Sequence, residues 1–272
     1  MFTFSSSRAL ALRSALFALV SLPLHSQASE QTQVYVSTSL ESNTAFTVSF
    51  DAAPRVSQLV SEGARVIRPH LLNQAQAHQS ELIYWQGASL FSNTLSDATT
   101  DLLESVKADL HTLSAEWADD AEYKASVDAL IGYIEDSTFR ERLDVPLDED
   151  FYLMGSRINP LANGDLTLIL PRRPEQVTVI GAVVEPKHVP FATLTDANGY
   201  LAHIDTLNTF GISEVAVVAM NGELANHKIA YWNGEAQNIP PGAVIFVPFQ
   251  RLPFGLSSLN EKLPRLLQHR VM

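Results

Sequence analysis

The sequence contains no cysteine in its 272 residues. This absence excludes a disulfide framework, cysteine nucleophiles, thiolate metal sites and thiol redox chemistry. The fold must therefore be stabilised by burial of apolar side chains. Basic residues are also few, because 18 Lys and Arg stand against 30 Asp and Glu, which gives a formal net charge of −12. Since nucleic-acid binding depends on Lys and Arg contacts to phosphate, we expect no nucleic-acid partner.

Long hydrophobic runs are missing as well, because a membrane-spanning helix takes roughly 20 apolar residues. The run at 15–20 lies close to the N-terminus, behind Arg8 and Arg13, and small residues that end at Ala28 follow it. A basic start, a short apolar run and small residues before a cleavage point are typical of a secretory signal peptide. We expect cleavage near Ala28, a periplasmic location and a mature protein that does not span the membrane.

The first part of the remaining chain has the pattern of strands and one helix. Alternating residues predict strands between 34 and 50, and β-favouring residues predict another strand over 82–85. Between them, Pro54 is expected to open a short helix that Gly63 closes.

Helical periodicity follows. Apolar residues recur every three or four positions over 102–117 and again over 123–134, which predicts two helices that pack as an antiparallel hairpin. A last amphipathic helix is expected over 256–271. Its apolar face could dock on its own domain or on a membrane or partner complex, and with Pro264 inside it is too short to span a bilayer.

An internal repeat organises these elements. Tyr84-Trp85-Gln86-Gly87 recurs as Tyr231-Trp232-Asn233-Gly234, and the runs 159–171 and 238–248 each place an Asn and Pro turn and a Gly before a strand that stops at Pro. We interpret the pattern as two copies of one unit of two strands, a helix and more strands. The helical hairpin would be inserted into the first copy.

A longer series of motifs has the order and spacing of a known family. It comprises Leu170-Pro171-Arg172-Arg173-Pro174, Gly181-Ala182-Val183, Tyr200-Leu201, Asn221-Gly222, Tyr231-Trp232-Asn233, Pro241-Gly242-Ala243, Val247-Pro248 and Leu259-Asn260. This series resembles the capsule biosynthesis GfcC family, periplasmic proteins encoded with group 4 capsule or O-antigen capsule export systems. The stretch 177–183, followed by Pro186, also resembles the opening strand of soluble-ligand-binding β-grasp domains in outer-membrane polysaccharide export proteins.

The resemblance implies an α+β fold with two tandem β-grasp domains. Residues 29–171 would form the first domain, with the hairpin inserted at about 96–142, and residues 172–250 the second; residues 251–272 would form a C-terminal amphipathic helix. One departure is Met220-Asn221-Gly222, where the family would have an acidic residue and Gly, but Asn-Gly suits the same tight turn.

No catalytic arrangement stands out. The sequence has neither a His-x-x-x-His spacing for zinc nor a Gly-x-Ser-x-Gly nucleophile elbow. The acids of 144–150 could in principle act as a glycosidase pair, but they crowd a Pro-containing loop where solvent would keep them all ionised. We expect no metal ion and no organic cofactor.

Five residues are candidates for ligand binding: Arg140, Arg142, Trp85, Tyr231 and Trp232. Aromatic rings can lie under the C–H faces of sugars, although one ring of each Tyr-Trp pair should be core because neighbours in a strand face opposite sides. The arginines follow the hairpin and could bind an acidic sugar or a phosphate. Their alternative role is to interact with the dipole at a helix C-terminus.

These observations favour a periplasmic, non-enzymatic accessory protein of capsule or O-antigen polysaccharide biosynthesis or export. Its partners would be the polysaccharide, the outer-membrane export machinery, or both. Two alternatives stay open. One is a periplasmic enzyme that modifies or trims the polysaccharide through Arg140 and the acids of 144–150. The other is an assembly factor that acts only through protein contacts of residues 256–272.

Overall fold

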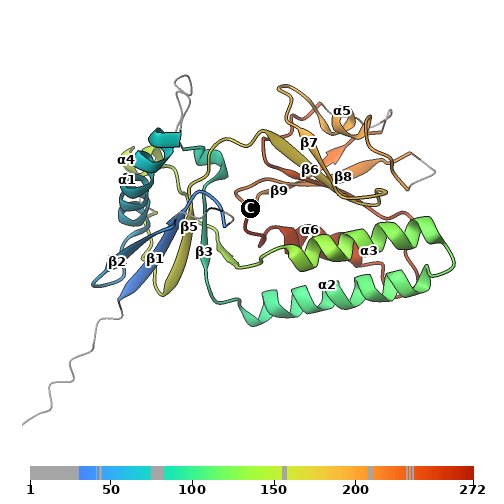
Figure 1. The fold of residues 1–272 in the computed structure, drawn as a ribbon, viewed down its shortest axis with the longest axis horizontal. Coiled ribbons are helices and arrows are strands. Elements are labelled where there is room, and N and C mark those ends of the chain that lie inside the picture. The colour runs from blue at the N-terminus through green and yellow to red at the C-terminus, as the bar shows by residue number, and fades with distance from the viewer. Residues whose placement is uncertain are drawn as a thin grey trace, which may run out of the picture.

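The computed structural model describes residues 31–40, 42, 45–74, 83–154, 158–207, 211–230, 232, 234 and 236–272. The expected signal peptide lies outside the described residues, so its cleavage stays a prediction. The described chain forms two five-stranded sheets with helices packed around them (Figure 1). The predicted α+β fold class is thereby confirmed, whereas the assignment of each unit to the β-grasp fold and the domain boundaries stay predictions.

The first sheet has the strand order β2-β1-β5-β3-β4. Its strands are β1 (Thr32–Ser37), β2 (Ala45–Phe50), β3 (Ser89–Ser92), β4 (Glu141–Leu143) and β5 (Asp165–Ile169). β1 and β5 are parallel, and all other neighbours are antiparallel. The register places Val34 of β1 beside Val48 of β2 and Leu166 of β5, which puts these apolar side chains on one buried face.

The second sheet has the strand order β7-β6-β10-β8-β9. Its strands are β6 (Gln176–Gly181), β7 (Lys187–Pro190), β8 (Glu214–Val218), β9 (Leu224–Lys228) and β10 (Val244–Val247). Here too the first and fifth strands are parallel and the other neighbours are antiparallel. Counted within each sheet, the strands stand in the same order, which supports the predicted duplication.

The predicted repeat is right in one part and wrong in another. The run from Asn159 leads into β5 and the run from Asn238 leads into β10, the fifth strands of the two sheets. The tetrapeptides are not equivalent, because 84–87 precedes the third strand of its sheet and 231–234 stands between the fourth and fifth strands. A match of four residues is short enough to arise without a shared structural position.

Helix α1 (Val56–Gln74) covers the first sheet and does not end at Gly63 as predicted. A Cβ at position 63 would lie 2.4 Å from Cδ2 of Leu168, so glycine serves close contact between helix and sheet. Ile67 and Leu71 continue the buried stripe beyond it. The prediction failed because a glycine can either end a helix or allow the helix to pack closely against a sheet.

The strand predicted over 82–85 is also wrong. Of this stretch the structure describes 83–85, and a 3-10 helix occupies Trp85–Gly87 before β3 begins. Gly87 packs so closely against Tyr84 that a Cβ would lie 2.6 Å from the ring Cδ1. The backbone N–H of Tyr84 donates to the carbonyl of Pro171 at 2.8 Å. The turn and this bond place the β-favouring residues outside the ladder.

Helices α2 (Asp97–Glu116) and α3 (Ala121–Asp136) form the predicted hairpin, which leaves the first sheet after β3 and returns at β4 (Figure 1). Ser96 and Asp120 cap the two N-termini with their side chains. The apolar side of the hairpin packs against the second sheet, with which it forms one core. Its buried apolar residues are Val106, Leu110, Leu113, Val127, Leu130 and Ile134.

The C-terminal helix α6 (Leu259–Leu267) docks on its own chain, the first of the two alternatives. All four of its leucines are buried, and they join the core of the hairpin and the second sheet. Nζ of Lys262 lies 2.7 Å from Oδ2 of Asp109 on α2, which ties α6 to the hairpin. Two short helices, α4 (Glu149–Leu153) and α5 (Ala197–Leu201), complete the fold.

Candidate functional site

Arg142 of β4 lies where the two sheets and the C-terminal segment meet. Its Nη1 donates to Oγ of Ser89 at 2.6 Å, and its Nη2 donates to the carbonyl of Arg270 at 3.3 Å. Its Nε donates to the carbonyl of Gln268, and the guanidinium carbon lies 4.4 Å from the ring centre of Phe91. One arginine therefore holds the end of the chain against the first sheet.

The turn between β8 and β9 closes over the same guanidinium. Gly222 has a φ of +87° and no room for a side chain beside Arg142. Nε2 of Gln268 donates to the carbonyl of Gly222 at 2.8 Å. Burial lowers the pKa of Arg142 to about 10, so that its side chain remains charged at neutral pH. The second sheet is thus fixed to the first through the surroundings of one half-buried cation.

The carbonyls that accept hydrogen bonds from Arg142 help to decide between the two roles expected of the arginines, ligand binding and interaction with a helix dipole. Gln268 is the C-cap residue of α6, so Arg142 interacts with the C-terminal end of a helix. The helix is α6, which contacts Arg142 from the far end of the sequence, rather than α3, which precedes it. The geometry therefore favours the structural role of Arg142, and its binding of an acidic sugar stays a prediction.

A pocket of about 460 Å³ brings Trp85 and Arg142 together, and Asn221 of the β8–β9 turn also lines it. Three exposed aspartates also line it: Asp144, Asp148 and Asp150. Oδ1 of Asp148 accepts the backbone N–H of Asp150 at 2.9 Å and so caps α4. A glycosidase acid needs a carboxyl in an apolar pocket. The exposure of these carboxylates does not favour glycoside hydrolysis.

Arg140 has different partners. Its Nη1 contacts Oδ1 of Asn93 and Oγ1 of Thr167, and its backbone N–H donates to the carbonyl of His269 at 2.9 Å. It is not among the described residues that line the pocket of Arg142. The structure therefore does not bring Arg140 together with the acids that the enzyme hypothesis would pair with it.

The second aromatic pair lies apart from the first. Tyr231 lies outside the described residues, and Trp232 is 76% exposed. Trp232 lines a pocket of about 560 Å³ together with Asn198, Ile212 and Ile229 of the second unit. The predicted binding residues thus do not form one site, because Trp85 and Arg142 share a pocket that neither Trp232 nor Arg140 lines.

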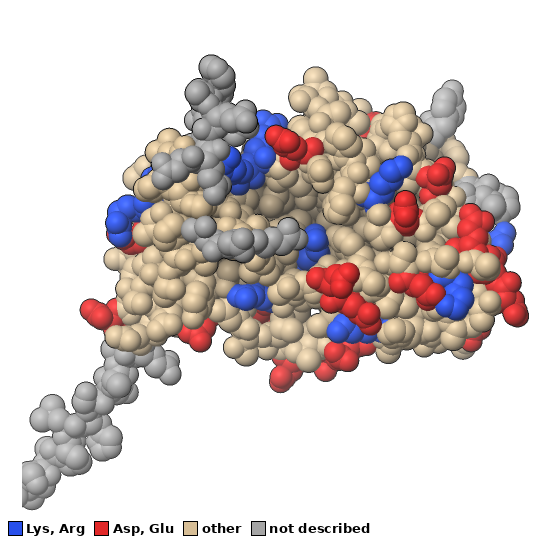
Figure 2. All heavy atoms as spheres, in the orientation of Figure 1, with Lys and Arg blue, Asp and Glu red and all other residues tan. Residues whose placement is uncertain are grey.

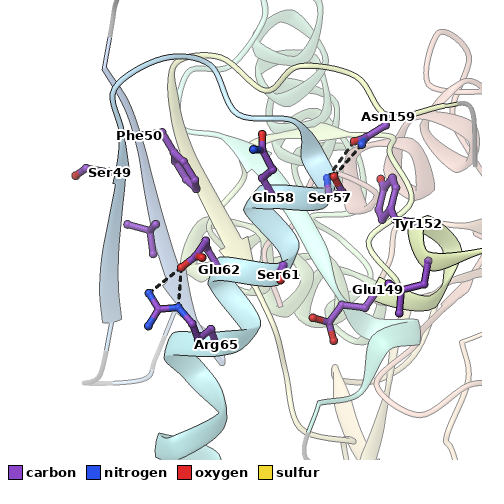
Figure 3. A pocket seen from close by; sticks show the side chains of 12 residues that line it. Ser49, Phe50, Ser57, Gln58, Ser61, Glu62, Arg65, Glu149, Tyr152 and Asn159 are labelled. Atoms are coloured by element: carbon purple, nitrogen blue, oxygen red, sulfur yellow. Dashed lines mark hydrogen bonds and ion pairs between the residues drawn. The ribbon is translucent and has the colours of Figure 1, made fainter. Parts of the chain in front are cut away.

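A third pocket, of about 830 Å³, lies over the N-terminal half of α1. Figure 3 shows Phe50 of β2 and Tyr152 of α4 on opposite sides of the helix, with the polar side chains of α1 between them. We call this pocket the α1 groove. Its lining residues are Val48, Ser49, Phe50, Ser57, Gln58, Ser61, Glu62, Arg65, Glu149, Tyr152, Leu153 and Asn159.

Contacts distant in sequence fix the frame of the α1 groove. Oδ1 of Asn159 accepts the backbone N–H of Ser57 at 3.1 Å, and its Nδ2 donates to Oγ of Ser57 at 2.8 Å (Figure 3). Arg68 of α1 forms an ion pair with Glu149, which holds α4 beside the helix. The sequence did not reveal this groove, because its residues come from segments up to about a hundred positions apart. The one pattern that could have indicated it is the row of polar residues spaced three and four positions apart on α1.

Charge is unevenly distributed over the molecule. The hairpin region 97–136 contains eleven acidic and two basic residues. Figure 2 shows acidic side chains gathered along this side of the molecule. The negative potential of the hairpin repels polyanions from this side of the molecule.

No described helix is long and apolar enough to cross a membrane. Within the same ranges, no group of three or more His, Asp or Glu side chains is placed to hold a metal ion.

The fold and the pockets define an α+β protein of two similar sheets, joined through a half-buried arginine and carrying open grooves of mixed polarity. The sequence profile of the capsule biosynthesis GfcC N-terminal region matches 42–173, and that of the GfcC C-terminal region matches 185–272. The chain belongs to the capsule biosynthesis GfcC family. It is also similar to the uncharacterized protein YjbG of Escherichia coli (strain K12), with 30% identity over 179 residues, 65% of this chain and 72% of the relative.

Membership of this family confirms the resemblance expected from the sequence motifs and supports a role in capsule biosynthesis.

Proposed function

We propose that this chain is a periplasmic, non-enzymatic accessory protein of capsule or O-antigen polysaccharide biosynthesis or export, which binds glycan or the export machinery. Family membership supports the pathway, and the N-terminal pattern of a basic start, an apolar run and small residues supports the location. Binding rather than catalysis is the role that the described pockets fit.

The observation that carries this role is the chemistry of the α1 groove. Sugar-binding sites combine apolar surface with a few placed polar groups. In the groove, rings of Phe50 and Tyr152 flank hydroxyl and amide groups of α1. Its carboxylates are held by arginines, Glu62 by Arg65 and Glu149 by Arg68, so neither is placed as an unpaired acid or base.

The two alternatives have less support. An enzyme that used Arg140 with the acids of 144–150 has less support, because Arg140 contacts Asn93 and Thr167 and is not among the described residues that line the pocket of the three aspartates. An assembly factor acting through 256–272 would need an exposed apolar face, but the leucines of α6 are buried on the chain itself.

Two measurements test the proposed function. Deletion of the gene should reduce surface polysaccharide, and a normal amount in the deletion strain would contradict a role in its biosynthesis or export. Titration calorimetry of the protein without residues 1–28 against polysaccharide from its own organism should show saturable binding. Absence of binding at high polysaccharide concentration would shift the role to protein partners.

The location has its own test. N-terminal sequencing of the protein recovered from a periplasmic extract should begin at Ser29. A protein that keeps Met1 and stays with the cytoplasmic fraction would contradict export.

A further inference from the structure

We infer that the α1 groove binds an uncharged stretch of glycan, with one sugar ring stacked on Tyr152. The inference rests on the proposed function, to which it adds the site and the chemical class of the ligand. It is carried by three properties of the groove: fixed aromatic walls, polar groups without partners, and charges that are already paired.

The aromatic walls are held in position before any ligand arrives. Oη of Tyr152 donates to the carbonyl of Pro146, and the ring makes an edge contact with Phe151 at 5.3 Å between centroids. Across the groove, Phe50 packs partly into the core of the first unit. A rigid ring loses little conformational entropy when a sugar stacks on it, which favours binding.

The floor of the groove offers hydrogen bonds that the protein does not use. The hydroxyl of Ser61 has no partner among the residues that the structure describes. Oε1 of Gln58 accepts the backbone N–H of Arg55 at 2.9 Å, and the amide nitrogen of Gln58 has no partner in the same ranges. Hydroxyls donate and accept, and an amide nitrogen donates. These groups match the hydroxyls of a neutral sugar, each of which both donates and accepts.

The charges of the groove argue against an acidic ligand. Arg65 is the only cation among the described lining residues, and its Nη2 lies 2.7 Å from Oε2 of Glu62. Glu149 is paired with Arg68. A uronic acid or a phosphate would therefore meet two carboxylates and no unpaired cation, in a protein of net charge −12. Uncharged hexoses or N-acetylated amino sugars avoid this cost.

The probes are oligosaccharides obtained by partial hydrolysis of the organism's surface polysaccharide and divided by anion exchange into an uncharged and an acidic fraction. Titration of the protein without residues 1–28 should show binding of the uncharged fraction, at least about tenfold tighter than binding of the acidic one. Equal or tighter binding of the acidic fraction would overturn the inference.

Aromatic residues inside and outside the groove supply variants. Tyr152→Ala should weaken binding of the uncharged fraction about tenfold, whereas Tyr152→Phe, which keeps the ring but loses the hydrogen bond to Pro146, should weaken it less. Phe254→Ala is the control, because Phe254 is fully exposed and is not among the described residues that line the groove. Ser61→Trp, a surface change that fills the groove, should abolish binding; circular dichroism and thermal unfolding verify that each variant is folded.

The outcomes separate this inference from the proposed function. If polysaccharide binds but neither Tyr152→Ala nor Ser61→Trp weakens it, the proposed function stands and the α1 groove is the wrong site. If neither the polysaccharide nor any fraction binds, the glycan-binding role and this inference both fail.

Discussion

Gly222 and Arg142 lie so close together that a side chain at position 222 would clash with the guanidinium group in its present position. A Cβ on Gly222 would lie 2.4 Å from Cδ and 2.5 Å from Nε of Arg142. The glycine belongs to the second sheet's β8–β9 turn and the arginine to β4 of the first sheet. This contact makes the arrangement of the two units depend on a turn residue that sequence analysis regarded only as a hairpin glycine.

Gly222→Ala should destabilise the protein by about 2–4 kcal/mol. The variant strains a backbone with φ of +87° and also displaces the arginine side chain. Gly164→Ala is the matched control, because Gly164 has the same φ of +87° but would meet nothing within 4 Å, so it should cost only about 1 kcal/mol. Urea unfolding measures both, and equal losses would show that Arg142 does not constrain position 222.

Arg142→Lys should cost about 2–3 kcal/mol, because an ammonium cannot reproduce the planar fork that reaches Ser89 and two carbonyls. Arg65→Lys is the control. Arg65 is an exposed residue paired with Glu62, and its replacement should change the free energy of unfolding by less than about 0.5 kcal/mol. A neutral effect of Arg142→Lys would mean that the guanidinium geometry is not needed.

Much of the fold could be predicted because its signals are local. The hairpin followed from apolar residues spaced every three or four positions, and the duplication followed from similar runs before β5 and β10. Two errors concern segments that contain a glycine. Gly63 is expected to end a helix but lies inside α1 against Leu168, and the strand predicted over 82–85 gives way to a turn in which Gly87 packs against Tyr84. Only the tertiary neighbours of a glycine distinguish these roles.

The sites were less predictable for the same reason. Of the five candidate residues, Trp85 and Arg142 line one pocket. The residues that accept hydrogen bonds from Arg142, Gln268 and Arg270, lie more than a hundred positions away in the sequence, so no local pattern could indicate them. The α1 groove combines β2, α1, α4 and Asn159, and no spacing in the sequence relates these segments. Periodicity indicates which face of an element is buried, but it does not indicate which elements meet.

The docking of α6 predicts a large effect of its core leucines. Leu263→Ala should lower the free energy of unfolding by about 2–5 kcal/mol, because Leu263 is completely buried. Phe254→Ala is the control, since Phe254 is fully exposed just before the helix, and it should change stability by less than about 0.5 kcal/mol. Chemical denaturation measures both. Similar small effects would indicate that α6 is not anchored on its own domain.

A buried histidine, His227, and a half-buried one, His269, predict a loss of stability in mild acid. Burial lowers the pKa of His269 below 6.5 although Glu141 lies nearby, and burial likewise lowers the pKa of His227 against the opposing effect of Asp196. The unfolded chain then binds more protons than the folded one below about pH 6.5, so the free energy of unfolding should fall as the pH falls from about 7 to about 5.

Replacement of these histidines tests whether they cause the loss of stability in mild acid. His269→Asn should reduce the slope of stability against pH in this window, His227→Asn should reduce it independently, and the double variant should remove most of what the two residues contribute. The two sites should be additive, because His227 lies on β9 of the second sheet and His269 contacts Glu141 and Arg142 of β4. The measurement is urea unfolding at a series of pH values. An unchanged slope in the double variant would show that both imidazoles titrate alike in the folded and unfolded chain, and that the acid sensitivity arises elsewhere.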